Sequence, residues 1–316
     1  MDLFLGGFSA VLAGIFTNPL EVVKIRMQLQ GELQAKGNYQ IHYRNIFHGA
    51  YTIGKNEGIF ALQKGLVPAL YFQFVINGLR LGIYDILNKS VLRNADGSVP
   101  QVKRLFAAAF TGTVGAIAAS PFFLIKTQLQ SQSSDNISVG TQHKHQNMTG
   151  AFRSIYSKYG IRGLWQGTSS SIPRIAIGSA VQLSTFEVAL DFTQKTYKMD
   201  NRWLNVLAAS FISGVVVAGF MNPFDLIATR FYNQEYNKQG KGITYKSVTD
   251  CAIKIWKKEG ISGFYKGLVP HYFRIGPHTL LNLMFWDQLK YYYQKCEIFT
   301  VFKSDILISY NMYNLQ

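Results

Sequence analysis

The sequence predicts an all-α membrane protein made of three tandem repeats of about 100 residues with pseudo-threefold symmetry. One motif occurs as PLEVVKIRMQ, PFFLIKTQLQ and PFDLIATRFY, which begin 102 residues apart at Pro19, Pro121 and Pro223. A second motif occurs as EGIFALQKG, YGIRGLWQG and EGISGFYKG, which end at Gly65, Gly167 and Gly267. This period is too long for a solenoid unit, so we expect a triplicated small domain. The repeats should cover residues 1–94, 95–197 and 198–296, followed by a C-terminal tail at 297–316.

Six apolar segments predict six transmembrane helices, two in each repeat. Each holds roughly the 20 residues that a membrane helix needs; they lie at about 3–28, 66–88, 103–130, 168–190, 203–232 and 268–292. A hydrophobic content of 48% with a mean hydropathy of only +0.05 favours amphipathic helices around a polar interior. The long connectors predict three short surface helices, at Tyr43–Asn56, Met148–Lys158 and Tyr245–Lys258. Because the remaining links are short, both termini should lie opposite these connectors.

The charge and cysteine content exclude several classes of protein. The net charge is +15, but the basic residues are scattered without a nucleic-acid motif, so anionic lipid is the expected partner. Two cysteines give no disulfide framework or metal site. The sequence contains no nucleophile motif or phosphate loop that would indicate an enzyme. Met1 and Asp2 run directly into the first apolar segment, which predicts no cleavable presequence.

Charged residues lie inside the first, third and fifth spans. Glu21 and Lys24 follow Pro19 on one helix face, at a depth where charge is costly and usually marks a pathway or a pair. A single such pair could equally extend to the membrane surface. Three proline-containing copies favour a ring of charges instead.

These motifs resemble the mitochondrial carrier family over about residues 3–292. The family signature is Pro-x-acid-x-x-base followed by acid-Gly-x4-aromatic-base-Gly. PLEVVK matches it fully, whereas Phe123 replaces an acid, Ala228 replaces a base and Gln63 replaces the aromatic. Within the family the chain most resembles the branch of solute carrier family 25 members thirty-four and thirty-five, beside the oxaloacetate carrier. The resemblance implies a multi-pass protein of the mitochondrial inner membrane that works as a monomer by alternating access.

The resemblance also implies two charged gates. The matrix gate would pair Asp225 with Lys126, leaving Glu21 opposite Ala228 and Lys24 opposite Phe123, so that one ion pair survives. Two glutamines, Gln28 and Gln130, match the family's braces beneath these pairs, with Tyr232 in the third place. On the cytoplasmic side the gate residues would be Asp85, Glu187, Asp287 and Lys290, with one pair between Lys290 and Asp85.

Counting back 13 residues from the cytoplasmic acids reaches the positions where carriers of this family contact substrate. Those positions hold Phe72, Arg174 and Arg274. We expect both arginines to lack an acidic partner and to bind carboxylate, phosphate or sulfate. Relatives often carry arginine in place of Phe72, so this residue should exclude a third carboxylate. The other expected contacts are Arg80, Gln73, Asn77 and Gln182, and His278 is either a proton-coupling group or, more in keeping with its setting, a packing residue.

Bound cardiolipin is the expected lipid partner, and no cofactor or metal is expected. Its phosphates would meet the residues that precede the even-numbered spans, namely Lys64, Gly65, Gly167, Lys266 and Gly267. These glycines could also serve simply to turn the chain.

The sequence therefore predicts exchange of small organic anions: dicarboxylates, oxoacids such as oxaloacetate, or sulfate-like anions. The strings PHYFRIGPHT and PRIAIGSAVQLSTFE resemble the matching helices of dicarboxylate and oxoglutarate carriers. Arg174 disfavours an adenine-nucleotide substrate. Two alternatives remain open, an uncoupling-protein-like leak of protons or anions and a membrane scaffold that transports nothing.

Overall fold

The computed structural model of the 316-residue chain describes residues 2–35, 37–92, 100–197, 202–237 and 239–313. Within these ranges the long helices are α1 (Asp2–Leu29), α3 (Leu66–Leu87), α4 (Gln101–Ser131), α6 (Thr168–Tyr197), α7 (Arg202–Asn233) and α9 (Leu268–Tyr313). Shorter helices occupy the three long connectors: α2 (Ile46–Glu57), α5 (Met148–Gly163) and α8 (Val248–Glu259). Each predicted span and surface helix therefore falls on an observed helix. The last helix also continues through most of the predicted tail.

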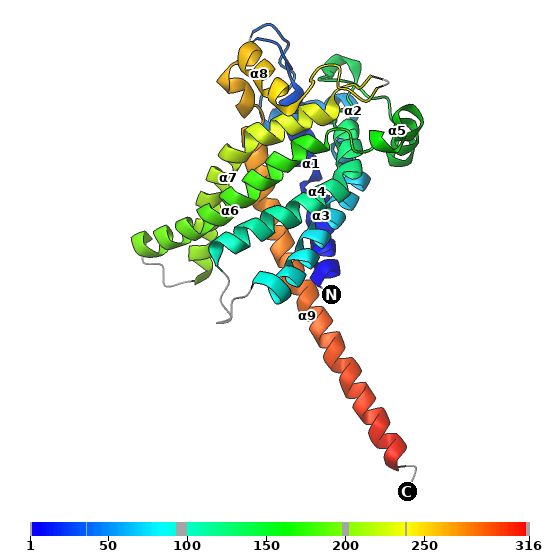
Figure 1. The fold of residues 1–316 in the computed structure, drawn as a ribbon, viewed down its shortest axis with the longest axis vertical. Helices are drawn as coiled ribbons and strands as arrows, with labels where there is room; N and C mark the ends of the chain where they lie inside the picture. Colours follow the sequence, from blue (N-terminus) through cyan, green and yellow to red (C-terminus); the bar gives the residue numbers. More distant parts are fainter. Residues whose placement is uncertain (1, 36, 93–99, 198–201, 238, 314–316) are drawn as a thin grey trace.

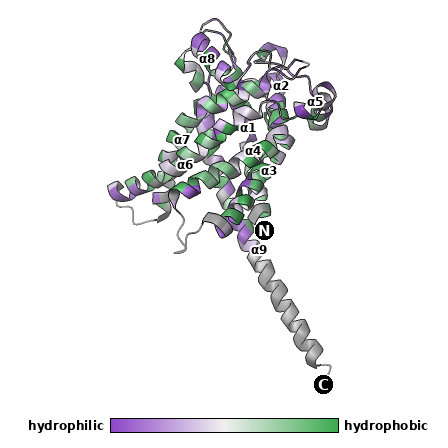
Figure 2. Ribbon diagram, viewed as in Figure 1, coloured by the Kyte–Doolittle hydropathy of each residue, from purple (hydrophilic) through white to green (hydrophobic). Residues whose placement is uncertain are grey.

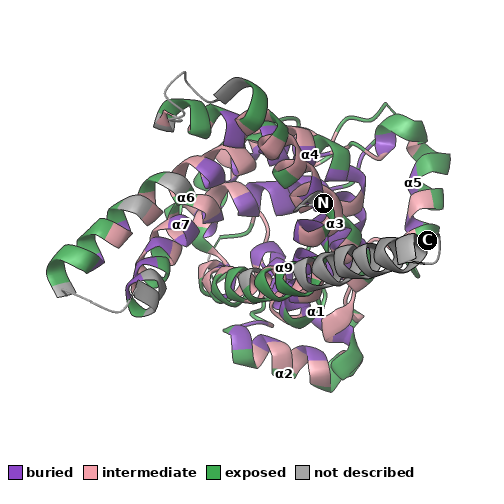
Figure 3. Cartoon of the chain, turned by 90° about the horizontal axis from the view of Figure 1, so that it is seen from below, coloured by how far each residue is buried: buried purple, intermediate pink, exposed green. Residues whose placement is uncertain are grey.

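The long helices enclose a common interior. Along the chain, α3 packs between α1 and α4, α6 packs between α4 and α7, and α9 returns to α1 and α7. The short helices α2, α5 and α8 gather at one end of the molecule, called here the connector end, while α1 begins and α9 ends at the other (Figure 1). This arrangement confirms the predicted sidedness. Buried residues gather where the helices face one another (Figure 3).

Five of the helical segments are long and apolar enough to cross a membrane. They are Phe4–Leu29, Ile59–Ser90, Val102–Ser131, Thr168–Thr196 and Ala208–Asn233. Hydrophobic residues lie along these helices (Figure 2), and large apolar side chains are exposed on them, among them Phe106, Phe211 and Phe220. Exposed apolar surface of this kind suits contact with lipid. The sixth predicted span, at 268–292, falls within α9 and is not among the five, so the number six stays a prediction.

The prolines of α1 and α4 are accommodated by side chains from the second motif. A proline inside a helix frees the carbonyl four residues earlier. For Pro19 this is the carbonyl of Ile15, which accepts a hydrogen bond from Gln63 Nε2 at 3.3 Å. In the next repeat, Trp165 Nε1 donates to the carbonyl of Ile117 at 2.8 Å, four residues before Pro121. The unexpected Gln63 thus replaces the aromatic donor.

Ion-pair networks anchor two of the three surface helices to the long helices. Arg26 on α1 binds Glu57 at the end of α2 with its two terminal guanidinium nitrogens, Nη1 and Nη2, at 2.5 and 2.9 Å. Lys64 binds the same carboxylate at 2.5 Å. The third repeat reproduces this network with the equivalent residues Arg230, Glu259 and Lys266. The second repeat replaces all three residues by neutral ones: Gln128, Tyr159 and Gln166.

Substituting Glu57 should destabilise the protein strongly. Its side chain is 5% exposed. Burial alone would raise the pKa of Glu57, but hydrogen bonds from Arg26 and Lys64 outweigh it and hold the pKa below its usual value. Glu57→Gln leaves Arg26 buried without a counter-charge, which should cost about 3–5 kcal/mol. The thermal unfolding temperature in detergent should fall accordingly.

The matched control is Tyr159→Phe, which removes one hydrogen bond to the carbonyl of Tyr236 and should cost about 1 kcal/mol.

Because the folded-state pKa of Glu57 is lowered, the contribution of Glu57 to stability is complete above the unfolded pKa of about 4.3 and declines as the pH falls below it. The wild type should therefore lose more stability on acidification than Glu57→Gln does. Equal acid sensitivity of the two proteins would contradict this account.

Candidate functional site

Two buried ion pairs join α1 to its neighbours near the connector end. Lys24 Nζ lies 2.5 Å from Asp225 Oδ2 on α7, and Lys126 Nζ on α4 lies 2.7 Å from Glu21 Oε1. None of these side chains is more than 10% exposed. The predicted pair between Asp225 and Lys126 was therefore wrong, and two pairs survive where one was expected. Glu21 faces Lys126 and not Ala228, and Lys24 faces Asp225 and not Phe123.

The direction of pairing follows from how the repeats pack. Each acid pairs with the base of the next repeat around the ring. The glycine that precedes the second long helix of each repeat (α3, α6 and α9) also contacts the next repeat around the ring. A Cβ added at these glycines would lie 2.7–2.9 Å from side-chain atoms of the next repeat's brace position: Gly65 against Gln130, Gly167 against Tyr232, and Gly267 against Gln28. The spacing of charges alone permits either direction, and this packing selects one.

The third junction, between the second and third repeats, is apolar. Phe123 stands where the acid would be and Ala228 where its basic partner would be, and both belong to one buried cluster. The ring of Phe123 lies 4.8 Å from that of Tyr232 and 5.0 Å from that of Phe72. The two departures from the signature thus fall on a single missing pair. Replacing both charges together leaves neither one unpaired.

The three brace positions differ in what they hold. Gln28 donates to Asp225 Oδ2 at 2.9 Å, directly at an ion pair. The side chain of Gln130 instead donates to Asn18 Oδ1 at 2.8 Å, while its backbone carbonyl accepts from Arg26 Nε at 3.3 Å. The hydroxyl of Tyr232 shares hydrogen bonds with Ser120 and Ser171. Gln28 therefore lies where the resemblance implied, whereas the side chain of Gln130 binds Asn18 on α1.

Both predicted substrate arginines reach the acids of the ion pairs. Arg274 Nη1 lies 3.2 Å from Glu21 Oε1, and Arg174 Nη1 lies 3.6 Å from Asp225 Oδ1. The expectation that these arginines lack acidic partners was wrong, because a guanidinium extends far enough to reach the adjacent acid level. We call the six residues the charge cluster: Glu21, Lys24, Lys126, Arg174, Asp225 and Arg274. Its four cations face two carboxylates, which leaves two positive charges in excess.

Sequence reasoning missed His271, which also lies against the charge cluster. Its Nδ1 is 3.3 Å from Asp225 Oδ2, and its side chain is 1% exposed. Neither ring nitrogen has a hydrogen-bond partner among the described residues. The equivalent positions in the other repeats hold Ala69 and Ser171. A polar, titratable residue at one of three symmetric positions was the signal available in the sequence.

A polar stripe runs along α3 from the charge cluster toward the other end. Gln73, Asn77 and Arg80 share one helix face by their spacing. Asn77 Nδ2 donates to the carbonyl of Gln73 at 2.9 Å. Arg80 forms no ion pair with any residue that the structure describes. It is the unpartnered guanidinium that was expected at Arg174 and Arg274. The remaining predicted contact, Gln182 on α6, is exposed.

His278 joins three helices by hydrogen bonds. Gln73 Nε2 on α3 lies 2.9 Å from His278 Nε2, which must therefore accept. The proton then resides on Nδ1, which lies 3.1 Å from Thr17 Oγ1 on α1. Both ring nitrogens are satisfied by a neutral imidazole. This geometry favours the packing interpretation of His278 over proton coupling.

Phe72 is 7% exposed and packs on the charge cluster rather than on open space. Lys126 Nζ lies 5.1 Å from the centre of its ring, within the range of a cation–π contact. Phe72 is thus at the same level as the charged residues. Arg174 makes a similar contact with Phe123, with its guanidinium carbon 5.0 Å from the centre of that ring. Its substrate role stays a prediction.

The end opposite the connectors carries no matching ion pair among the described residues. Asp85 pairs with Lys89 one turn further along, at 2.6 Å, and Lys290 lies over the ring of Trp286 at 5.2 Å. The predicted pair between Lys290 and Asp85 is therefore not made in this structure, and Asp287 is exposed. The side chain of Glu187 lies outside the described residues. The buried ion pairs described above thus lie at the connector end.

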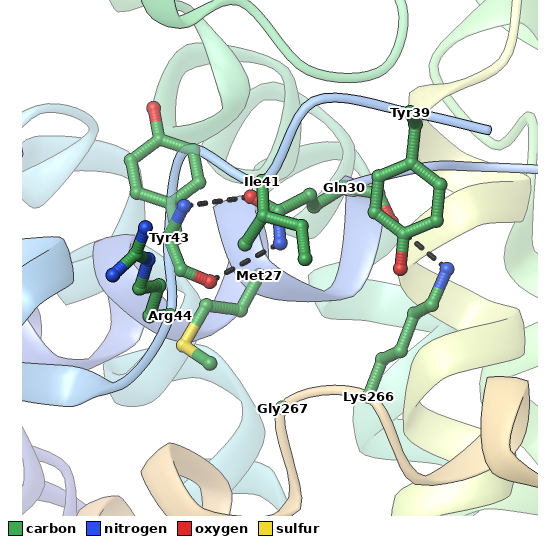
Figure 4. Close-up of a pocket in the computed structure, with 8 residues that line it drawn as sticks. All are labelled: Met27, Gln30, Tyr39, Ile41, Tyr43, Arg44, Lys266 and Gly267. Atoms are coloured by element: carbon green, nitrogen blue, oxygen red, sulfur yellow. Dashed lines mark hydrogen bonds between the residues drawn. The ribbon is translucent and has the colours of Figure 1, made fainter. Parts of the chain in front are cut away.

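The lysines predicted to bind lipid point toward protein. Lys64 binds Glu57, and Lys266 binds Glu259 and the carbonyl of Gln30, at 2.7 and 3.0 Å. The glycines do turn the chain, since Gly65, Gly167 and Gly267 all have positive φ. Figure 4 shows an open pocket beside Gly267, between the first and third repeats, with Arg44, Tyr39 and Tyr43 among its lining residues. Cardiolipin binding at the residues that precede these helices stays a prediction.

Comparison with known proteins agrees with the fold and the motifs. The model of the mitochondrial carrier protein family matches residues 1–95, 97–197 and 200–297. Solute carrier family 25 member 35 of Mus musculus is 47% identical over 93% of this chain and 98% of its own length. The mitochondrial oxaloacetate transport protein of Saccharomyces cerevisiae is 40% identical, over 90% of this chain and 86% of its own length. Mitochondrial citrate transporter E of Aspergillus niger is 41% identical, over 90% of both chains.

The three repeats, their apolar helices and their buried charges define a membrane carrier. The chain belongs to the mitochondrial carrier family, and it is a multi-pass transport protein of the mitochondrial inner membrane.

A double-mutant cycle can test the direction of pairing. Glu21→Gln and Lys126→Gln should each lower the unfolding temperature, and the double variant should lose less than the sum, with a coupling of about 0.5–3 kcal/mol. Lys126→Gln and Asp225→Asn, the pair implied by the resemblance, should add almost independently. Stronger coupling in the second cycle than in the first would contradict the arrangement described here.

Proposed function

We propose that this carrier exchanges small organic dianions across the mitochondrial inner membrane, with dicarboxylates, oxoacids such as oxaloacetate, and sulfate as the candidate substrates. The observation that carries the proposal is the excess of two positive charges in the charge cluster. A bound dianion would neutralise this excess in surroundings where charges are poorly screened. Arg80 adds a further cation on the polar stripe of α3, where it would attract an anion that enters from the end opposite the connectors.

Substrate binding would also act on the gate. In the structure Arg174 and Arg274 each approach one gate acid, Asp225 and Glu21 respectively. Guanidinium groups bind carboxylates in paired geometry, so an entering dianion competes with these two acids for the same arginines. Loss of these contacts would leave each gate acid with one cation fewer, so the network that closes the matrix side would hold together fewer helices. Binding energy is thereby directed to opening the matrix side, as alternating access requires, because the ligand favours one state over the other.

The uncoupling-like leak was motivated by two gates with one ion pair each. Two pairs and an apolar contact close the matrix end, which weakens that motive, whereas the pair expected between Lys290 and Asp85 at the opposite end is not made. A scaffold function has no structural feature of its own to support it. Two of the relatives, moreover, are named for transport of oxaloacetate and of citrate.

Purified protein in liposomes provides the direct test. Internal malate should exchange for external malate, oxaloacetate or sulfate, and not for ADP or lysine. Robust exchange of ADP or lysine, or proton conductance without any anion exchange, would overturn the proposal.

Loss of either arginine should weaken substrate binding. Arg174→Ala or Arg274→Ala removes a charge-assisted hydrogen bond of about 1.5–3 kcal/mol. The apparent affinity for malate should fall about tenfold to a hundredfold. The matched control is Arg153→Ala, which removes an exposed arginine on α5. Unchanged exchange in an Arg174 or Arg274 variant would return that arginine to a structural role.

Phe72 should influence how many carboxylates the site accepts. Phe72→Arg would raise the excess positive charge of the cluster from two to three and so favour a tricarboxylate. The ratio of citrate to malate inhibition of one labelled substrate should rise. Phe72→Leu serves as the control for lost aromatic packing, with thermal stability measured for both. If Phe72→Arg folds normally and the ratio stays at the wild-type value, Phe72 does not face substrate.

A further inference from the structure

We propose that His271 is the group that takes up a proton when the carrier binds its dianion, so that anion and proton move together. The inference rests on the proposed function and extends it by naming a second transported species and the residue that carries it. It depends on where His271 lies, on what surrounds it and on what it lacks.

The position of His271 ties it to both gate and substrate. It lies in the first turn of α9, three residues before Arg274, and its Nδ1 is 3.3 Å from Asp225 Oδ2. Asp225 is the acid whose other contacts are Lys24 of α1, Gln28 of α1 and Arg174 of α6. His271 is thus within reach of the acid that must change partners when the gate opens.

The ring nitrogens of His271 are buried and unsatisfied. Its side chain is 1% exposed, and neither Nδ1 nor Nε2 has a hydrogen-bond partner among the described residues. Leaving buried polar atoms unpaired is costly, so such a group in a native protein calls for a reason. An acid 3.3 Å away gives a protonated imidazole an immediate partner. His278 differs, because its nitrogens already bond to Gln73 and Thr17.

The surrounding charges explain when the proton would bind. The charged groups around His271 are Asp225 on α7, Lys24 on α1, Arg174 on α6 and Arg274 on α9. The charge cluster already has two positive charges in excess, and a third on His271 would be repelled. A bound dianion removes that excess, so the positive charge that a proton brings to His271 is no longer repelled by the cluster. By linkage, the anion then favours the proton and the proton favours the anion to the same extent.

The balance of the step is simple. One proton from water adds to a ring nitrogen of neutral His271 when the dianion binds, and it leaves when the anion is released. No covalent bond of the substrate changes. A carrier with this device would accumulate anions on the side with the higher pH when a proton gradient is imposed.

Proton uptake on binding is the decisive measurement. Sulfate is a suitable probe because it carries no titratable proton near neutral pH, and malate provides a second one. Wild-type protein in detergent, in weak buffer with a pH indicator, should take up close to one proton for each bound anion. The apparent affinity should rise as the pH falls between about 8 and 6, by at most about tenfold per pH unit for one linked proton. In liposomes, an acidic exterior should accelerate uptake.

Two variants assign the proton to a residue. His271→Gln should keep anion exchange at equal pH on both sides but lose proton uptake and the response to a pH gradient. His278→Gln, the matched control, should keep both. A second substitution, His271→Ala, introduces the residue that the first repeat has at the equivalent position, Ala69, and covers the case in which glutamine disturbs folding.

The outcomes separate this inference from the proposed function. Anion exchange by the wild type without proton uptake overturns the role of His271 alone. Proton uptake that persists in both His271 variants, or that disappears in His278→Gln, also overturns it. Failure of the wild type to bind or exchange any dianion would overturn the proposed function, and this inference with it.

Discussion

The connector end of the molecule depends on two carboxylates, one buried on α1 and the other on α7. Glu21 and Asp225 lie where an isolated charge would be very costly, so each must be neutralised by cations from other helices. Lys126 and Lys24 do this across the junctions between repeats, and Arg274 and Arg174 approach from α9 and α6. Removing either carboxylate would leave its lysine buried without that counter-charge, and removing a lysine would leave the carboxylate with one arginine. The positions of five long helices are therefore coupled through a few atoms.

The threefold pattern is broken in one consistent place. The second repeat supplies no acid to the matrix gate, and it has no Arg–Glu–Lys network beneath its surface helix. Its junction with the third repeat is made by Phe123, Ala228 and Tyr232. Apolar groups of suitable volume can replace a buried ion pair at little or no cost in stability. The contact of Phe123 with Ala228 and Tyr232 offers no charge with which an anion could compete, and the charge at this junction comes from Arg174 and Asp225 beside it.

Much of the fold could be predicted from the sequence because the chain repeats itself. The fixed step aligned every helix, and the prolines marked the same depth in three spans. The pairing of charges could not be predicted in the same way. Spacing places Lys126 equally near either neighbouring acid, and only the contact of Gly65 with Gln130 and its two equivalents fixes the direction. The reach of Arg174 and Arg274 was likewise hidden, because their acid partners lie on other helices. His271 was overlooked because its neighbours in the sequence carry no charge.

Both surviving ion pairs include residues of the first repeat. Glu21 and Lys24 lie one helical turn apart on α1, and they face α4 and α7 respectively. At the level of the gate acids the first repeat is joined to each of the others by a lysine–carboxylate pair. The second and third repeats are joined there by the contact of Phe123 with Tyr232 and by Arg174 with Asp225. An anion that draws Arg274 from Glu21 and Arg174 from Asp225 would remove one contact between the third and first repeats and one between the second and third. No arginine stands at the corresponding place in the first repeat, which has Phe72 there. The competition would therefore act at two of the three junctions, although the architecture is threefold.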